Sequence, residues 1–338
     1  MKNRDKFIGN KHIVEYLNRA LRNQSFVHAY LFTGPSNIGK FKLSLDFAKS
    51  VLCQNTNNII SNKSCNECDS CLQFDKGVHA DFHLLQKDDD KKNISVESIR
   101  LFQKKFYRTS LLSKMKVGII DMADTLNIEG ANALLKTLEE PPGKSIIILI
   151  SENFDSLPST VVSRCQIIPF TQVAKSEIIE MLENIGCDKL KAKTISSLSL
   201  GKPGIAVEFF KNVKIYENHK ENIRELIQLL SKNIPDKFGF IQRSLGTKKY
   251  QERLDEAVKL LGQINIIMRD CMLVKSGLDQ QIINVSELAN LKKISGSFKY
   301  SDLVMHQKKS QSMINKLSYN INPQLALENY FLTMKPYA

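Results

Sequence analysis

The sequence predicts an α/β fold in the first half of the chain and an all-helical fold in the second half. Up to about residue 170, short apolar runs alternate with segments of helical spacing, which indicates a parallel sheet covered on both faces. A glycine-rich loop follows the first apolar run, at residues 34–40. After residue 170 the strand signals stop, and amphipathic helical patterns fill the rest of the chain.

The predicted sheet has five short apolar strands, at residues 29–34, 81–86, 116–121, 145–151 and 166–170. Helices are expected between them, at residues 40–52, 95–107 and 127–140. Ser95 is a suitable N-cap for the second of these helices, and Glu97 lies in its first turn. Pro141 and Pro142 stop the third helix, because proline cannot continue the backbone hydrogen bonds.

The sequence pattern of the second half of the chain predicts helices only. Three short ones are expected at residues 175–186, 188–200 and 202–212, and longer amphipathic ones follow from about residue 213. The last begins at Asn322 and Pro323, a cap residue and a favoured first residue. We therefore expect three domains: residues 1–168 with a cysteine-rich module at about 53–71, a small helical domain at 169–212, and a helical domain at 213–338.

Composition narrows the class of protein. The 338 residues are 42% hydrophobic and 25% charged, the balance of a soluble globular protein with a proper core. No apolar run is long enough to cross a membrane and the polar start is no signal peptide, so we expect a cytoplasmic protein with no membrane partner. The net charge of +13 suggests a polyanionic partner such as nucleic acid. A composition rich in Lys, Asn and Ile would produce the same charge, so charge alone does not establish a nucleic-acid partner.

Residues 31–44, LFTGPSNIGKFKLS, nearly match the phosphate-binding loop G-x-x-x-x-G-K-[ST]. Gly34, Gly39 and Lys40 stand where the pattern requires them, between a strand and a helix. In a working loop, backbone N–H groups surround the phosphates, the lysine reaches the outer ones, and the final hydroxyl holds Mg²⁺. Here the final residue is Phe41, which has no oxygen. Passive binding of ATP and the absence of any ligand both remain open.

A second motif bears on the same reaction. The strand at residues 116–121 ends in Asp121, the position of a carboxylate associated with Mg²⁺. Active ATPases usually follow this aspartate with a glutamate that polarises the attacking water, but Met122 stands here. Asp124 lies two residues further on and would not normally point to the same place. Because metal ligand and water activator are lost independently, we predict that the chain does not hydrolyse ATP by itself.

Four of the seven cysteines cluster in the sequence: Cys53, Cys65, Cys68 and Cys71. Four thiolates at this spacing can complete a tetrahedral zinc site with no open position, which indicates a structural role. Free surface thiols and an iron–sulfur cluster are the alternatives. His79 and His83 could replace a ligand, although a packed or solvent-facing role fits them better because four sulfurs already complete the site.

Several motifs in order along the chain resemble the bacterial clamp-loader subunits of the AAA+ class. They are HAYLFTGP, the cysteine segment followed by HADFHLL, EGANALLKTLEEPP, LPSTVVSRC and, near the end, NINPQLALENYFL. The resemblance implies a subunit ring for DNA replication, with an ATP site at each subunit boundary and the last domain forming a collar. It implies as partners gamma/tau and delta subunits, the sliding clamp and primed DNA.

The resemblance also implies a role for Arg164. The arginine of the SRC motif reaches the γ-phosphate bound to the neighbouring subunit, as an arginine finger. A structural arginine at the start of a strand is the alternative. Catalytic relatives often place an arginine near Ile205, which this chain lacks, and Ser151 could stand at a polar sensor position.

The sequence therefore favours a clamp-loader subunit that does not hydrolyse ATP. The alternative is a gamma/tau-type ATPase subunit, which should show Ser or Thr at position 41 and Glu at position 122. A P-loop kinase and a zinc-dependent DNA-reading module fit less well. The first leaves the cysteines and the helical half unexplained, and the second needs a basic recognition helix near the cysteines.

Overall fold

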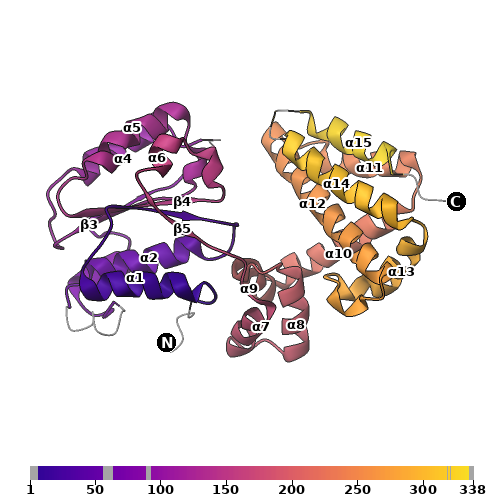
Figure 1. The fold of residues 1–338 in the computed structure, drawn as a ribbon, viewed down its shortest axis with the longest axis horizontal. Coiled ribbons are helices and arrows are strands. Elements are labelled where there is room, and N and C mark those ends of the chain that lie inside the picture. The colour runs from indigo at the N-terminus through magenta and orange to yellow at the C-terminus, as the bar shows by residue number, and fades with distance from the viewer. Residues whose placement is uncertain (1–6, 56–63, 89–92, 318, 320, 335–338) are drawn as a thin grey trace. The chain divides into compact units, whose positions relative to one another are not determined.

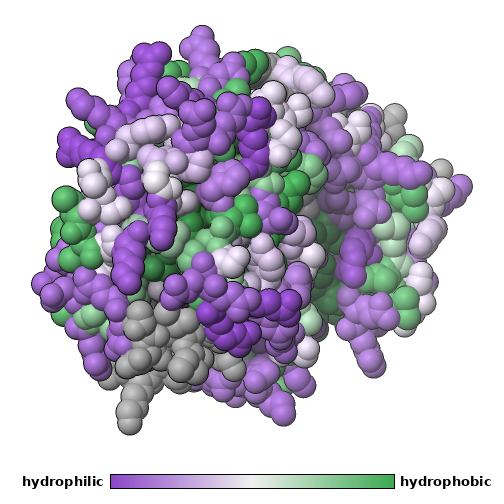
Figure 2. Space-filling view, turned by 60° about the vertical axis from the view of Figure 1, so that its left-hand side comes forward, coloured by the Kyte–Doolittle hydropathy of each residue, from purple (hydrophilic) through white to green (hydrophobic). Residues whose placement is uncertain are grey.

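The computed structural model describes residues 7–55, 64–88, 93–317, 319 and 321–334, in two compact units (Figure 1). The first comprises the described residues of Met1–Gly186 together with Gly201–Ala206, and the second those of Cys187–Leu200 and Val207–Ala338. The division into three domains stays a prediction. None of the described helices is long and apolar enough to cross a membrane. Figure 2 shows mostly hydrophilic residues on the visible surface, with smaller hydrophobic groups between them.

A five-stranded parallel sheet forms the centre of the first unit. Its strands are β1 (Ala29–Thr33), β2 (Phe82–Leu85), β3 (Lys116–Ile120), β4 (Ser145–Ser151) and β5 (Gln166–Pro169). They lie in the order β2-β3-β4-β1-β5, and every neighbouring pair is parallel. All residues of β1, β3 and β4 are buried, as in a sheet covered on both faces. The predicted fold class is confirmed.

Helices cover the two faces of this sheet (Figure 1). On one face lie α1 (Lys11–Asn23) and α2 (Lys40–Leu52), and on the other α4 (Val96–Phe106), α5 (Ile128–Glu139) and α6 (Ser159–Val162). The first unit also contains α3 (Asp69–Asp75), α7 (Lys175–Asn184) and the short 3-10 helices η2 (Ala123–Thr125) and η3 (Phe154–Ser156).

Local signals explain where these helices begin and end. The Ser95 side chain accepts a hydrogen bond from the Ser98 N–H and caps α4, as predicted. Asn127 caps α5 in the same way, and α5 ends at Glu139, shortly before Pro141. One face of the sheet packs on α4, α5 and α6 through a continuous apolar core that includes Leu31, Ile99, Leu134 and Leu149.

Helices are the regular elements of the second unit, and no strand occurs among its described residues, as predicted. Its helices are α8 (Lys189–Leu198), α10 (Val213–Leu230), α11 (Ile234–Leu245), α12 (Tyr250–Lys275), α13 (Leu288–Gly296), α14 (Tyr300–Leu317) and α15 (Pro323–Leu332), with η4 (Asp279–Gln281) and η5 (Val285–Glu287). Helix α9 (Pro203–Lys211) begins in the first unit and ends in the second. Leu261, Ile264 and Leu327 are fully buried in the core of this unit. Asn322 caps α15 at the predicted position.

Candidate functional site

The topology brings the expected nucleotide residues to one edge of the sheet. Strands β1 and β4 are neighbours, and Thr33 lies opposite Ser151 at their carboxyl ends. The chain leaves β1 toward α2 on one face and leaves β4 toward α6 on the other (Figure 1). A crevice for ligands forms where adjacent strands connect to opposite faces in this way. The glycine loop, Asp121 and Ser151 all lie at this carboxyl edge.

Two glycines of the loop are needed for its shape. Gly34 has φ 133°, and a side chain there would place its Cβ 2.3 Å from the carbonyl oxygen of Phe170. Gly39 has φ 101°, and its Cβ would lie 2.8 Å from the ring of Phe7. Both positions combine a positive φ with a close neighbour, so only glycine fits without strain. The fold alone is therefore enough to explain why these glycines are present.

Lys40 is turned onto its own loop. Its Nζ donates to the carbonyl oxygens of Gly34 and Pro35, at 2.5 and 2.7 Å. Burial lowers the pKa of Lys40, and the carboxylates of Glu152, Asp124 and Asp121 oppose this effect. The side chain is thus a buried cation whose hydrogen bonds hold the loop closed on itself.

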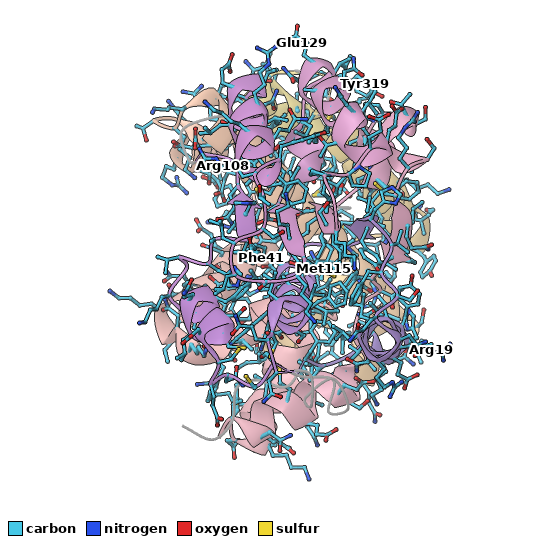
Figure 3. The ribbon with its side chains drawn as sticks, turned by 90° about the vertical axis from the view of Figure 1, so that its left-hand side faces the viewer. Arg19, Phe41, Arg108, Met115, Glu129 and Tyr319 are labelled. Carbon is cyan, nitrogen blue, oxygen red and sulfur yellow. The ribbon has the colours of Figure 1, made fainter. Side chains whose placement is uncertain are left out.

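The two departures from the ATPase pattern lie at the same edge. Phe41, labelled in Figure 3, is half-buried in the first turn of α2. Asp121 follows β3, and its carboxylate accepts hydrogen bonds from the Met122 N–H at 3.0 Å and from Gln86 Nε2 at 3.3 Å. Met122 is 44% exposed and has a φ of 52°. A hydroxyl is missing at position 41 and a carboxylate at position 122, although the surrounding frame is present.

Two further side chains complete this edge. Ser151 is buried and donates from Oγ to the carbonyl oxygen of Asn153 at 2.8 Å, so its hydroxyl is held by its own loop. Lys202, just before α9, donates to Ser36 Oγ at 3.4 Å, and the Gly204 N–H donates to the Asn37 carbonyl oxygen at 2.9 Å. The sequence did not reveal Lys202, because only the folded chain brings it to the glycine loop.

Arg164 lies away from the glycine loop in sequence, between α6 and β5. Its Nε and Nη2 donate to Glu139 Oε1 at 2.8 and 2.5 Å, and its Nη1 donates to the Thr160 carbonyl oxygen at 2.7 Å. The side chains of Arg164 and Glu139 are 34% and 48% exposed. Arg164 is therefore a surface cation that is held by hydrogen bonds to its own chain. Its side chain is neither buried in a core nor fully free.

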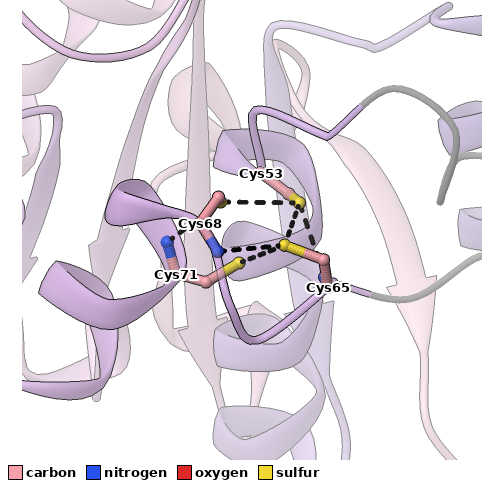
Figure 4. Close-up of side chains that lie close together, drawn as sticks. All are labelled: Cys53, Cys65, Cys68 and Cys71. Carbon is pink, nitrogen blue, oxygen red and sulfur yellow. Dashed lines mark hydrogen bonds between the residues drawn. The ribbon is translucent and has the colours of Figure 1, made fainter.

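The four predicted cysteines come together at the other end of α2 (Figure 4). Cys53 follows this helix, Cys65 lies in the next described segment, Cys68 caps α3, and Cys71 lies in the first turn of α3. Their sulfurs all lie within 4.8 Å of one another, with distances of 3.6, 4.0 and 3.9 Å for the pairs 53–65, 53–68 and 65–71.

This geometry fits a metal ion. Sulfurs bound tetrahedrally at about 2.3 Å from zinc would be about 3.8 Å apart. Backbone N–H groups also point at the sulfurs: Cys68 N–H lies 3.3 Å from Cys65 Sγ, and Cys71 N–H lies 3.5 Å from Cys68 Sγ. Backbone hydrogen bonds from Glu67 and Cys68 lower the pKa of Cys65 to about 6, which favours the thiolate that a metal binds, whereas burial raises the pKa of the Cys53 and Cys71 thiols. The cluster could hold a metal ion.

A buried polar network lies behind the cysteines. His79 Nε2 is 2.8 Å from Ser70 Oγ, and the Asp81 N–H donates to His79 Nδ1 at 3.0 Å. Ser70 and Ser113 both donate to the carbonyl oxygen of Leu52, the last residue of α2. His79 therefore has a packed, hydrogen-bonded role.

His83 contacts the rings of Phe102 and Phe106. Within the described part of the chain, the metal cluster contains only the four cysteines. Neither histidine therefore contributes a ligand to it.

Comparisons with known proteins find a family model and several relatives that match this sequence. The family model described as "DNA polymerase III, delta subunit" matches residues 9–174. The DNA polymerase III subunit delta' of Bacillus subtilis is 29% identical over 80% of this chain and 79% of its own length. Subunit delta' of Pseudomonas aeruginosa is 37% identical over 41% of each chain. Subunit gamma of Buchnera aphidicola subsp. Acyrthosiphon pisum is 29% identical over 77% of this chain and 71% of its own length.

The parallel sheet, with a glycine loop between its first strand and the following helix at the carboxyl edge, defines an α/β protein of the P-loop class. Within that class, the chain belongs to the clamp-loader family of DNA polymerase III subunits. The relatives include delta', gamma and tau subunits, so the family is established at a coarser level than the individual subunit.

Proposed function

We propose that this chain is the delta' subunit of a DNA polymerase III clamp loader, and that it lends Arg164 to an ATP site on a neighbouring subunit. It helps to load the sliding clamp onto primed DNA in the cytoplasm, together with gamma/tau and delta subunits. It does not hydrolyse ATP itself, and any DNA polymerase activity belongs to the assembled complex.

One observation carries the proposal: two groups needed for hydrolysis are absent from an otherwise intact frame. Phe41 stands where a hydroxyl would hold Mg²⁺, and Met122 stands where a carboxylate would polarise water. Lys40 donates to its own loop, and Asp121 is held by Gln86 and the Met122 N–H. The half-exposed Arg164 supports a role toward another subunit, since a finger must reach outside its own chain.

We also propose that the cysteine cluster binds structural zinc. Four thiolates complete a tetrahedral shell and leave no position for a substrate or for water. The ion would join the end of α2 to α3, which Lys49 already links through hydrogen bonds to Asn66 and Asp75 at 2.6 Å each. No step of ATP hydrolysis involves this ion.

The test is Mg²⁺-dependent ATP hydrolysis by the isolated chain, with Lys40→Ala as the matched control. We expect the two proteins to give the same background rate. Turnover approaching about 1 s⁻¹, the low end of ordinary enzyme rates, would contradict the proposal if Lys40→Ala abolished it.

A gamma/tau-type ATPase subunit is the second candidate. The observation in its favour is that the Buchnera gamma subunit matches this chain at the same identity, 29%, as the Bacillus delta' subunit. The same hydrolysis assay separates the two candidates, because a gamma/tau-type ATPase subunit would lose its turnover in Lys40→Ala.

A further inference from the structure

We propose that Glu139 holds Arg164 in a parked position in the free subunit, and that a phosphate group must displace the Glu139 carboxylate before the arginine can act. The inference rests on the proposed finger role of Arg164 and adds a residue that regulates it. Glu139 is the last residue of α5, and Arg164 follows α6, so the pair joins two separate elements.

The hydrogen bonds of Arg164 define the parked position. Nε and Nη2 both donate to Glu139 Oε1, at 2.8 and 2.5 Å. Nη1 donates to the Thr160 carbonyl oxygen at 2.7 Å and to Ser163 Oγ at 3.4 Å. The Nε and Nη2 groups form the edge of a guanidinium that grips carboxylates and phosphates with two parallel hydrogen bonds. A carboxylate of the same chain therefore occupies the edge that a γ-phosphate would use.

The position of Glu139 in its helix points to the same role. Helix α5 ends in two acidic residues, Glu139 and the cap residue Glu140. The last carbonyl groups of a helix carry partial negative charge, so carboxylates are disfavoured at this end and cations are favoured. Arg164 supplies the positive charge that Glu139 needs there. Glu140 is an exposed neighbour and offers a matched control of the same charge.

The pair is weak enough to be exchanged. Its two side chains are 34% and 48% exposed, and ion pairs with this degree of exposure contribute little because water and salt screen them. A γ-phosphate carries more charge and more acceptor oxygens than one carboxylate. The γ-phosphate therefore displaces the Glu139 carboxylate from Arg164, and this exchange of hydrogen-bond acceptors needs no covalent step. Water, which carries no charge, leaves the ion pair in place. Glu139 thus lowers the fraction of subunits with an available arginine until ATP is bound across the boundary.

The test uses the complex reconstituted from this chain with the gamma/tau and delta subunits of the same organism, assayed for ATP hydrolysis. Glu139→Gln is expected to raise kcat/KM for ATP about two- to fivefold, the range that exposed ion pairs span. Glu140→Gln should leave it unchanged, and Arg164→Ala should lower it. The gain in Glu139→Gln should shrink as salt rises from about 0.05 to 0.5 M, because salt screens the pair.

A second readout uses the isolated ¹⁵N-labelled chain. The Nε–H resonance of Arg164 should shift in Glu139→Gln and stay in place in Glu140→Gln. If Glu139→Gln lowers kcat/KM as Arg164→Ala does, the carboxylate orients the arginine and the inference is wrong. If it behaves as Glu140→Gln does while Arg164→Ala lowers the rate, the inference alone fails. An unchanged rate in Arg164→Ala contradicts the finger itself, and the inference with it.

Discussion

The two ends of helix α2 carry candidate binding sites that differ in whether all the expected ligand groups are present. At its first turn, the glycine loop keeps its backbone and its lysine but has Phe41 in place of a hydroxyl. Beyond its last residue, four cysteine sulfurs converge as a complete ligand set. The difference teaches that a retained backbone does not imply a retained reaction. The glycines are explained by close packing, whereas the cysteines form the full donor set that a metal requires.

Removing one cysteine should produce the largest effect. Cys65→Ser leaves three sulfurs, and we expect bound zinc to fall from about one ion per chain to none. The free energy of unfolding should fall by about 4 kcal/mol or more, because loss of a structural metal is among the most damaging changes. Elemental analysis and denaturant unfolding, each with and without a chelator, measure both quantities.

The matched control for this prediction is Cys165→Ser, which removes a half-buried cysteine outside the cluster. It should keep its metal and its sensitivity to the chelator. A Cys65→Ser protein as stable as the wild type, with the same response to the chelator, would remove the contrast between the two ends of α2.

A smaller effect is expected from Asp81, which supports the cysteine end. Burial raises the pKa of Asp81, but hydrogen bonds from the backbone of Leu111, Ser113 and Leu112 outweigh it and lower the pKa below its usual range. Asp81→Asn should lower the free energy of unfolding by about 1–3 kcal/mol at pH 7, because the buried N–H groups lose a charged acceptor.

The pH dependence of this effect follows from the lowered pKa. The stabilisation is fully present above the unfolded pKa of about 3.9 and is lost as the pH falls through the folded value. The gap between wild type and Asp81→Asn should therefore narrow below about pH 4 in urea unfolding. As a control, Asp155→Asn changes an exposed residue and should leave the free energy of unfolding equal to that of the wild type both at pH 7 and below about pH 4. A gap that widens in acid would contradict this reading of Asp81.

Local patterns predicted much of the fold. All five strands and the full extent of α2 were expected from apolar runs and helical spacing, because these signals lie within short segments. Helix α1 was not predicted. The cysteine cluster was found because its four cysteines lie close in sequence.

Contacts between elements that are distant in the chain could not be predicted from the sequence. Glu139, at the end of α5, and Arg164, in the segment between α6 and β5, are 25 positions apart, and Lys202 is 166 positions from Ser36. Neither spacing follows a local period, so no pattern in the sequence could pair them. They meet because the parallel sheet gathers the ends of separate segments: Glu139 and Arg164 lie before the amino ends of β4 and β5, whereas Ser36 follows the carboxyl end of β1.

The central claim is that the chain's own glycine loop is dispensable for hydrolysis while its arginine is required. One comparison tests it: ATP hydrolysis by the reconstituted complex carrying Lys40→Ala or Arg164→Ala in this chain alone. We predict a wild-type rate for Lys40→Ala. For Arg164→Ala, we predict a loss of about 10³-fold or more at the single ATP site that the arginine faces. A loss of activity in Lys40→Ala with a wild-type rate in Arg164→Ala would contradict the account.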